Sequence, residues 1–450
     1  MKEEVLHYVW QHQSFDRAGL QTVQQKPIII RSVGTLNSNA GPDFAQARLL
    51  IGDLEWCGSV EIHIRSSDWD RHGHQNDSAY NRVVLHVVWQ HDQEVFRLDG
   101  TPIPTLELKQ RVDHSVLLRS QSLLDSQQPF ISCALQVSRV AEITKISQIE
   151  RVAAQRLERK ANEILNQLEA NGGNWEETSY QWLLKGFGFK TNQEAMQQLA
   201  LALPLRWVKK WYENQLQLQT VFLQQAGLSK YASQNWITQP PELTQNRMST
   251  SAWRYSRMRP ANMPHVRIKQ VTQLLGKWEA NLSWLVQMLS VDEYLRKFSL
   301  LEGNVQPIGK GSIAVLLINT VVPLLSAYGM YYRDAQYQQH AWECLRQLPA
   351  EKNQITKKYA QLGFPQESAL DSQGLIELHQ HFCSKKQCLK CSIGSEVMKK
   401  HHLFVSLSPN PEKLARCGLL CSIVAFILAS SFFGTTVSKK DQWLVGFCQL

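Results

Sequence analysis

Polar and hydrophobic residues alternate along much of the first 110 residues. From Ser59 to Ile64, a valine or isoleucine at every second position alternates with Ser59, Glu61 and His63. A period of two is typical of a β-strand whose two faces differ. Strand-like patterns also occur at 26–33, 48–56, 83–89 and 105–109. Gly52-Asp53 within the second of these segments predicts a hairpin turn.

Helical patterns accompany these strands. Residues 3–15 carry a single apolar stripe, and Ser67-Asp68-Trp69-Asp70 is typical of a helix N-terminus. The pattern therefore predicts an N-terminal domain of the α+β or α/β class over residues 1–112.

After residue 112 the hydrophobic period changes to 3.6, which is typical of amphipathic helices. The clearest case is Ile149 to Ala170, where an apolar stripe lies opposite many charged residues. Further helices are expected at 180–211 (broken at Pro204), 214–226, 266–289 and 313–328. We therefore expect a larger, mostly α-helical body over 113–380, with a cysteine-containing segment at 381–395 that closes it.

The two ends of the chain bear on location. The N-terminus, MKEEVLHYVW, has acidic residues and no long apolar run, so it is not a signal peptide and predicts a cytoplasmic protein. Residues 396–450 form a basic and then apolar tail, in which 417–438 carries no charge. That length suits a membrane helix, so the tail is either a membrane anchor or a loosely packed, disordered extension.

Composition adds one constraint. The formal net charge is +9, which favours an anionic partner such as nucleic acid, although a merely basic soluble protein fits equally well. The sequence contains no Walker A motif, dinucleotide-binding glycine fingerprint, G-x-S-x-G or H-E-x-x-H. The enzyme classes that depend on these motifs are therefore excluded.

The strongest candidate site combines Asp43, Glu61 and His63. Glu61 and His63 share one face of the predicted strand, and Asp43 begins the preceding hairpin. Carboxylates can hold Mg²⁺ or Mn²⁺ against a phosphate, while a neighbouring basic group assists the attacking water. We expect Asp43 and Glu61 as metal ligands and His63 in the basic role.

This arrangement resembles the PD-(D/E)XK superfamily of nucleases through Pro42-Asp43 and Glu61-Ile62-His63. The resemblance implies a restriction-endonuclease-like mixed sheet and metal-dependent cleavage of DNA or RNA. His63 stands where that superfamily usually has lysine. The alternative is a non-catalytic scaffold that binds nucleic acid or protein and retains a degenerate nuclease site.

Two rival sites lie nearby. His72 and His74, with Asp68 or Asp77, have the imidazole and carboxylate groups that bind Zn²⁺ or Mn²⁺. Glu107-Leu-Lys109 spells E-x-K, but we expect it to be the solvated face of an edge strand. His86, inside the apolar run VVLHVV, is expected to be a hydrogen-bonded core histidine.

A second metal site is indicated by Cys383, Cys388 and Cys391 in a C-x4-C-x2-C pattern. Thiolates at this spacing bind Zn²⁺ or an iron–sulfur cluster, although three reduced cysteines in a loop fit as well. The possible fourth ligands are His381, His379, Cys344 and Cys417. The intervening lysines at 385, 386 and 390 are expected to lower the pKa of the thiols.

The segment from Trp253 to Pro260 mixes aromatic residues with Arg254, Arg257 and Arg259. This mixture would hold a single nucleic-acid strand by stacking and phosphate contacts. The competing interpretation is a loop that Trp253 and Tyr255 anchor between helices.

The chain as a whole resembles an uncharacterised bacterial family defined only as a domain of unknown function. The resemblance lies in NAGPDF at 39–44, G-x-VEIH at 58–63, SDW-x-x-H-x-H at 67–74, LHVV at 85–88, RP-x-N-x-P at 259–264, LPAE-x-N at 348–353 and the cysteine pattern at 383–394. It implies that residues 1–395 form one unit and supplies no activity.

Overall fold

The computed structural model describes residues 1–37, 40–232, 237–256, 258–301 and 305–399. Three predictions fall outside these residues: the apolar run 417–438, a ligand role for Cys417 and nucleic-acid binding by Arg257.

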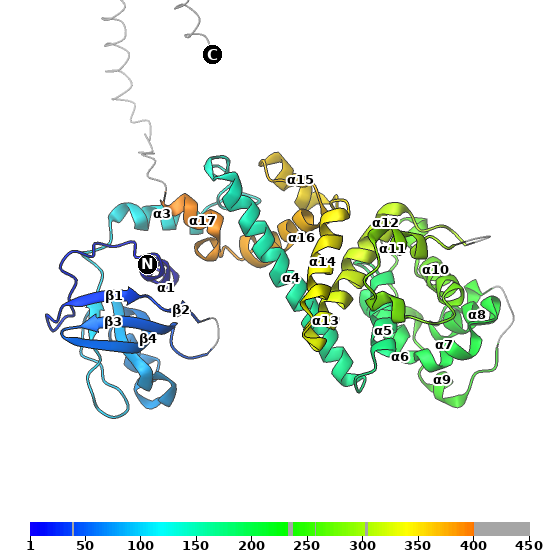
Figure 1. Cartoon of the computed structure of the whole chain (residues 1–450), viewed down its shortest axis with the longest axis horizontal. Coiled ribbons are helices and arrows are strands. Elements are labelled where there is room, and N and C mark those ends of the chain that lie inside the picture. Colours follow the sequence, from blue (N-terminus) through cyan, green and yellow to red (C-terminus); the bar gives the residue numbers. More distant parts are fainter. Residues whose placement is uncertain (38–39, 233–236, 257, 302–304, 400–450) are drawn as a thin grey trace, which may run out of the picture. The chain divides into compact units, whose positions relative to one another are not determined.

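A mixed sheet forms the N-terminal part (Figure 1). Its strands are β1 (Ile28–Ser32), β2 (Thr35–Leu36), β3 (Phe44–Ile51), β4 (Leu54–Arg65), β5 (Val83–Gln90) and β6 (Thr105–Glu107). The order is β1-β3-β4-β5-β6, with β2 paired to β3. β3 and β4 form the predicted hairpin, while β5 and β6 continue in parallel. The predicted α+β or α/β class is confirmed.

The central strands are apolar on both faces because helices and loops cover them. β5 is buried from Val83 to Val88, as expected of a parallel strand between two layers. The crossover from β4 to β5 contains the short helix α2 (Asp68–Arg71), and α1 (Glu3–Gln11) packs against β4. This crossover and α1 carry the residues that complete the candidate site.

The rest of the described chain is mostly helical. The helices are α3 (His114–Leu124), α4 (Glu142–Ala170), α5 (Trp175–Phe187), α6 (Gln193–Ala202), α7 (Leu205–Trp211), α8 (Gln215–Gln225), α9 (Pro241–Gln245), α10 (Pro264–Lys277), α11 (Val291–Phe298), α12 (Lys310–Leu316), α13 (Val322–Tyr332), α14 (Ala335–Gln347), α15 (Gln354–Gln361), α16 (Ala369–Glu377) and α17 (Ser392–Lys399). Figure 1 shows α4 beside α13 and α16, against which it packs. The predicted helical body is confirmed in outline.

Two predicted helices have the wrong limits. The helix expected at 266–289 ends at Lys277, because Glu279 and Ala280 adopt left-handed φ angles of 53° and 52°. The apolar pattern continues because Leu282 and Leu285 are buried outside that helix. The segment expected at 180–211 has a second break, between α5 and α6, in addition to the one at Pro204.

The helix expected at 313–328 extends from Lys310 to Tyr332, with a π-helical turn at Leu317–Val321 between α12 and α13. The turn precedes Pro323, whose ring cannot accommodate an ordinary helical carbonyl four residues earlier. By length and composition this helix could cross a membrane, but 78% of its apolar window is buried inside the protein. It is therefore packed as a core helix is.

Two hydrophobic cores organise the described residues. One lies within the helical body; the other covers the sheet and also takes in Cys133, Leu389, Cys391 and Ile393. The segment with the predicted cysteine site therefore packs into the core of the sheet. The boundaries expected at 112, 380 and 395 stay predictions.

Candidate metal centre

Asp43 and Glu61 lie side by side because their backbones and side chains bind each other. The N–H of Asp43 donates to Glu61 Oε2 and the N–H of Ile62 donates to Asp43 Oδ2, each at 3.0 Å. A β-bulge in β3 sets this alignment: Phe44 pairs with Val60, and Ala47 with Gly58. Gln46, the extra residue, has a left-handed φ of 59°.

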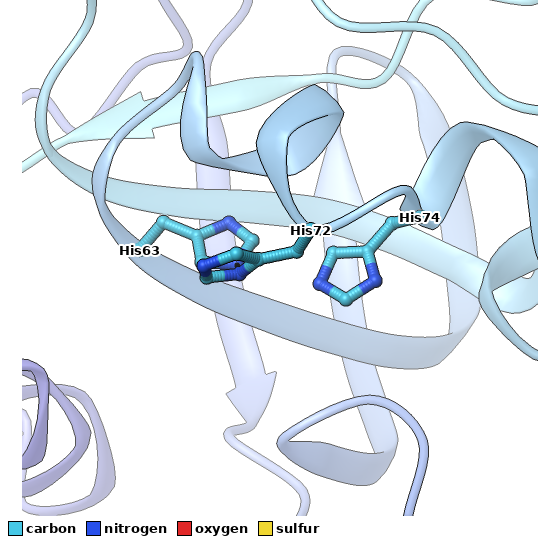
Figure 2. A group of neighbouring side chains, drawn as sticks. All are labelled: His63, His72 and His74. Carbon is cyan, nitrogen blue, oxygen red and sulfur yellow. Dashed lines mark hydrogen bonds between the residues drawn. The ribbon is translucent and has the colours of Figure 1, made fainter.

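Three histidines gather on the same face of the sheet. His63 lies on β4, while His72 and His74 follow α2 on either side of Gly73, whose φ of 77° turns the chain back. One ring nitrogen from each lies within 4.8 Å of the other two. Figure 2 shows the His63 and His72 rings meeting, with His74 beside them.

Glu61 completes this group. Its Oε1 lies 3.5 Å from His63 Nε2 and 3.3 Å from His74 Nε2. His72 Nδ1 lies 3.1 Å from the same His63 Nε2. Two donors that bind one zinc ion at about 2.0–2.1 Å lie about 3.3 Å apart in a tetrahedral arrangement. These separations therefore match those of a metal's ligands.

His86 orients His63 from behind. It pairs with Glu61 in the parallel β4–β5 ladder, and its Nε2 lies 2.9 Å from His63 Nδ1. If His63 uses Nε2 for a metal, its Nδ1–H must donate to His86, which fixes the ring. His86 is fully buried, as expected of a core histidine, but it also supports the site.

Burial favours the neutral form of these groups. It raises the pKa of Glu61 to about 9, with the charge of Asp43 adding to the effect. It lowers the pKa of His63 to about 2 and that of His86 to about 3, helped by the neighbouring imidazoles. Neutral imidazole is the metal-binding form. A divalent cation would also supply the positive charge that ionised Glu61 lacks.

A second group adjoins the first. One donor atom each from Glu3, His7 and Asp43 lies within 4.8 Å of the other two. His7 Nε2 is 3.2 Å from Asp43 Oδ2. The sequence hypothesis missed Glu3 and His7, although their spacing of four residues places both on one face of α1.

The site is open on one side. His72 is exposed and Asp43 is about one-fifth exposed, whereas His63 and Glu61 are buried. Tyr80 stacks on His74 with ring centroids 3.8 Å apart, and Trp69 packs against His74 and His86. A ligand can therefore approach beside His72, while packing holds the deeper groups.

The two acids suggested as partners of His72 and His74 are engaged elsewhere. Asp68 accepts from the N–H of Arg65 at 3.0 Å and pairs with Arg71, and Asp77 accepts from the N–H of Ala79 at 2.8 Å. Glu61 takes their place beside the histidines.

The remaining sequence candidates lie outside this group. Glu107 is on β6, an edge strand, and the exposed Lys109 donates to Gln90 Oε1 at 3.3 Å. Trp253 is buried and donates to the carbonyl of Ala226 at 2.8 Å, so it anchors a loop and is not free to stack on bases.

Arg254 and Arg259 are exposed in the segment that Trp253 anchors. Nucleic-acid binding by these two side chains stays a prediction, without the stacking contribution of Trp253.

Comparison with known proteins gives a family and no activity. The family model described as a protein of unknown function (DUF2851) matches residues 3–354. No curated protein and no solved structure matches. The match includes the candidate metal centre and ends before the cysteine segment.

Proposed function

Because the chain belongs to the DUF2851 family, whose function is unknown, we propose its function from the site itself: metal-dependent hydrolysis of phosphodiester bonds in nucleic acid. The observation that carries the proposal is the set of four side chains, Glu61, His63, His72 and His74, whose donor atoms approach one another at 3.1–3.5 Å. A buried group of this kind without a cation leaves four mutually unfavourable dipoles together.

The donor set favours Zn²⁺ or Mn²⁺ over Mg²⁺. Three imidazoles and one carboxylate suit transition metals, whereas Mg²⁺ prefers oxygen ligands and water. His63 then acts as a ligand, whereas the sequence hypothesis gave it a basic role. Asp43 supports Glu61 through the backbone and stands next to the metal-binding group.

When bound, the metal would polarise the phosphate and activate a water molecule. The chain's own groups do the rest. His86 holds the His63 ring, and the backbone N–H of Asp43 holds Glu61 Oε2 so that Oε1 faces the histidines. We assign proton transfer to His7, next to Asp43 at the same site.

Charge supports an anionic substrate. Arg65 and Arg71 are exposed at the end of β4 and in α2, beside His72. The net charge of +9 acts in the same direction over the whole chain.

The test is a cleavage assay on labelled single- and double-stranded DNA and RNA with Zn²⁺, Mn²⁺ or Mg²⁺. Glu61→Gln keeps the shape of the side chain and removes its charge, so we expect the rate to fall at least about 100-fold. Glu107→Gln, on edge strand β6, is the matched control and should cleave as the wild type does.

Wild-type protein that shows no cleavage with all three metals, or Glu61→Gln that cleaves at the wild-type rate, would remove the hydrolase proposal. Binding of nucleic acid without cleavage would support the scaffold alternative.

A further inference from the structure

The cysteine segment folds so that its three thiols face the core of the sheet. Cys383 ends a π-helical turn (Leu378–Cys383), and Cys388 begins a 3-10 turn (Cys388–Lys390). Between them Lys386 adopts a left-handed φ of 53° and its N–H bonds to the carbonyl of Cys383 at 3.1 Å. This reversal brings the chain back, and Cys391 follows as a buried residue.

A fourth thiol comes from far away in the sequence. Cys133, in the connection between α3 and α4, is 8% exposed and belongs to the same core as Cys391. Two contacts join its segment to the others: Lys386 Nζ donates to the carbonyl of Ser126 at 3.2 Å, and the Ser132 hydroxyl bonds to the Cys388 thiol. The Cys133 thiol interacts electrostatically with all three of the others.

Hydrogen-bond donors point at these sulfurs. The Tyr359 hydroxyl donates to Cys383 Sγ at 3.2 Å, and the backbones of Ile393 and Gly394 bond to the Cys391 thiol. At Gly394 a Cβ atom would lie 2.0 Å from the carbonyl of Cys388, so only glycine allows this approach. Donors arranged around sulfur stabilise metal-bound thiolates.

The residues proposed earlier as fourth ligand are used elsewhere. Cys344 lies in the core of the helical body, 3.6 Å from His340 Nε2. His381 pairs with Glu377, and His379 stacks on Phe130. Cys133 alone of the cysteines at 57, 133 and 344 shares a core with the C-x4-C-x2-C segment.

The expected lowering of thiol pKa by the lysines is wrong for this site. Burial raises the pKa of Cys383 to about 12 and also raises those of Cys388 and Cys391, and it outweighs the small effect of Lys386 on Cys388. Buried thiols of this kind ionise when a metal binds them.

We propose that Cys133, Cys383, Cys388 and Cys391 together hold an iron–sulfur cluster. A single Zn²⁺ with Zn–S bonds of about 2.3 Å needs sulfurs about 3.8 Å apart. Among the described residues, no three thiols lie within 4.8 Å of one another. A cluster binds cysteines at its outer corners, so it requires this wider spacing.

The test is metal analysis of the full chain purified without oxygen. We expect iron and acid-labile sulfide in equal amounts, with the visible absorbance of a cluster. Cys133→Ser should lose both to the same extent as Cys388→Ser, while Cys344→Ser and Cys57→Ser should keep them. Zinc without iron or sulfide would overturn the cluster, and full iron in Cys133→Ser would overturn the assignment of Cys133.

A measurement on the wild type covers a variant that fails to fold. A maleimide followed by peptide mass spectrometry should label the exposed Cys57 at once and the four proposed ligands only after chelation and oxidation of the cluster. Labelling of Cys133 at the rate of Cys57 in the untreated protein would also overturn the proposal.

Discussion

His72→Ala is expected to empty the N-terminal metal centre and leave the fold intact. His72 is the exposed member of the histidine group, so the substitution leaves no cavity, whereas His63 is buried against β5. Metal affinity should fall by more than the about 10–100-fold that loss of a supporting second-shell group costs. Metal content after gel filtration, with thermal unfolding followed by circular dichroism, measures both effects.

The control for His72→Ala is His114→Ala. His114 is exposed in the first turn of α3 and has no part in the group. Unchanged metal content in the His72 variant would contradict the three-histidine assignment, even if the protein bound zinc elsewhere.

Glu377→Ala is expected to destabilise the helical body by about 3 kcal/mol. Glu377, at the end of α16, is buried and accepts from Arg156 at 3.4 Å and Arg159 at 3.0 Å, both on α4. Its removal leaves the largely buried Arg156 without its counter-ion, and breaking a buried pair costs about 3–5 kcal/mol. The lower value applies because Arg159 remains partly solvated.

Chemical denaturation of the two variants measures this effect. Glu150→Ala is the matched control, since Glu150 on α4 pairs with Arg346 at 3.5 Å and both are exposed; its loss should cost about 0–1 kcal/mol. Equal stability of the two variants would show that Glu377 contributes no more than a surface pair.

The sheet side of the candidate site could be predicted because strand geometry relates residues close in sequence. Alternation alone places Glu61 and His63 on one face, and the turn at Gly52 returns the chain so that Asp43 faces Glu61. The Gly73 turn likewise keeps His72 and His74 within a few residues of α2. The functional roles of these residues stay predictions.

Long-range packing could not be predicted in the same way. His7 reaches Asp43 only because α1 covers β4, and Cys133 reaches the cysteine segment across 250 intervening residues. Helix ends were also missed, since buried residues after Lys277 extend the helical pattern beyond the hydrogen-bonded helix. In each case tertiary contacts decide, and a local pattern does not contain them.

The bulge at Gln46 imposes a rule on the length of the chain. Side chains alternate between the faces of a strand, so deleting one residue between Asp43 and Gly52 would turn Asp43 away from Glu61. Substitutions in this segment can be absorbed one at a time, but a gap cannot. In an alignment of relatives, an ungapped distance from this aspartate to the hairpin should therefore distinguish chains that keep the site from those that keep only the sheet.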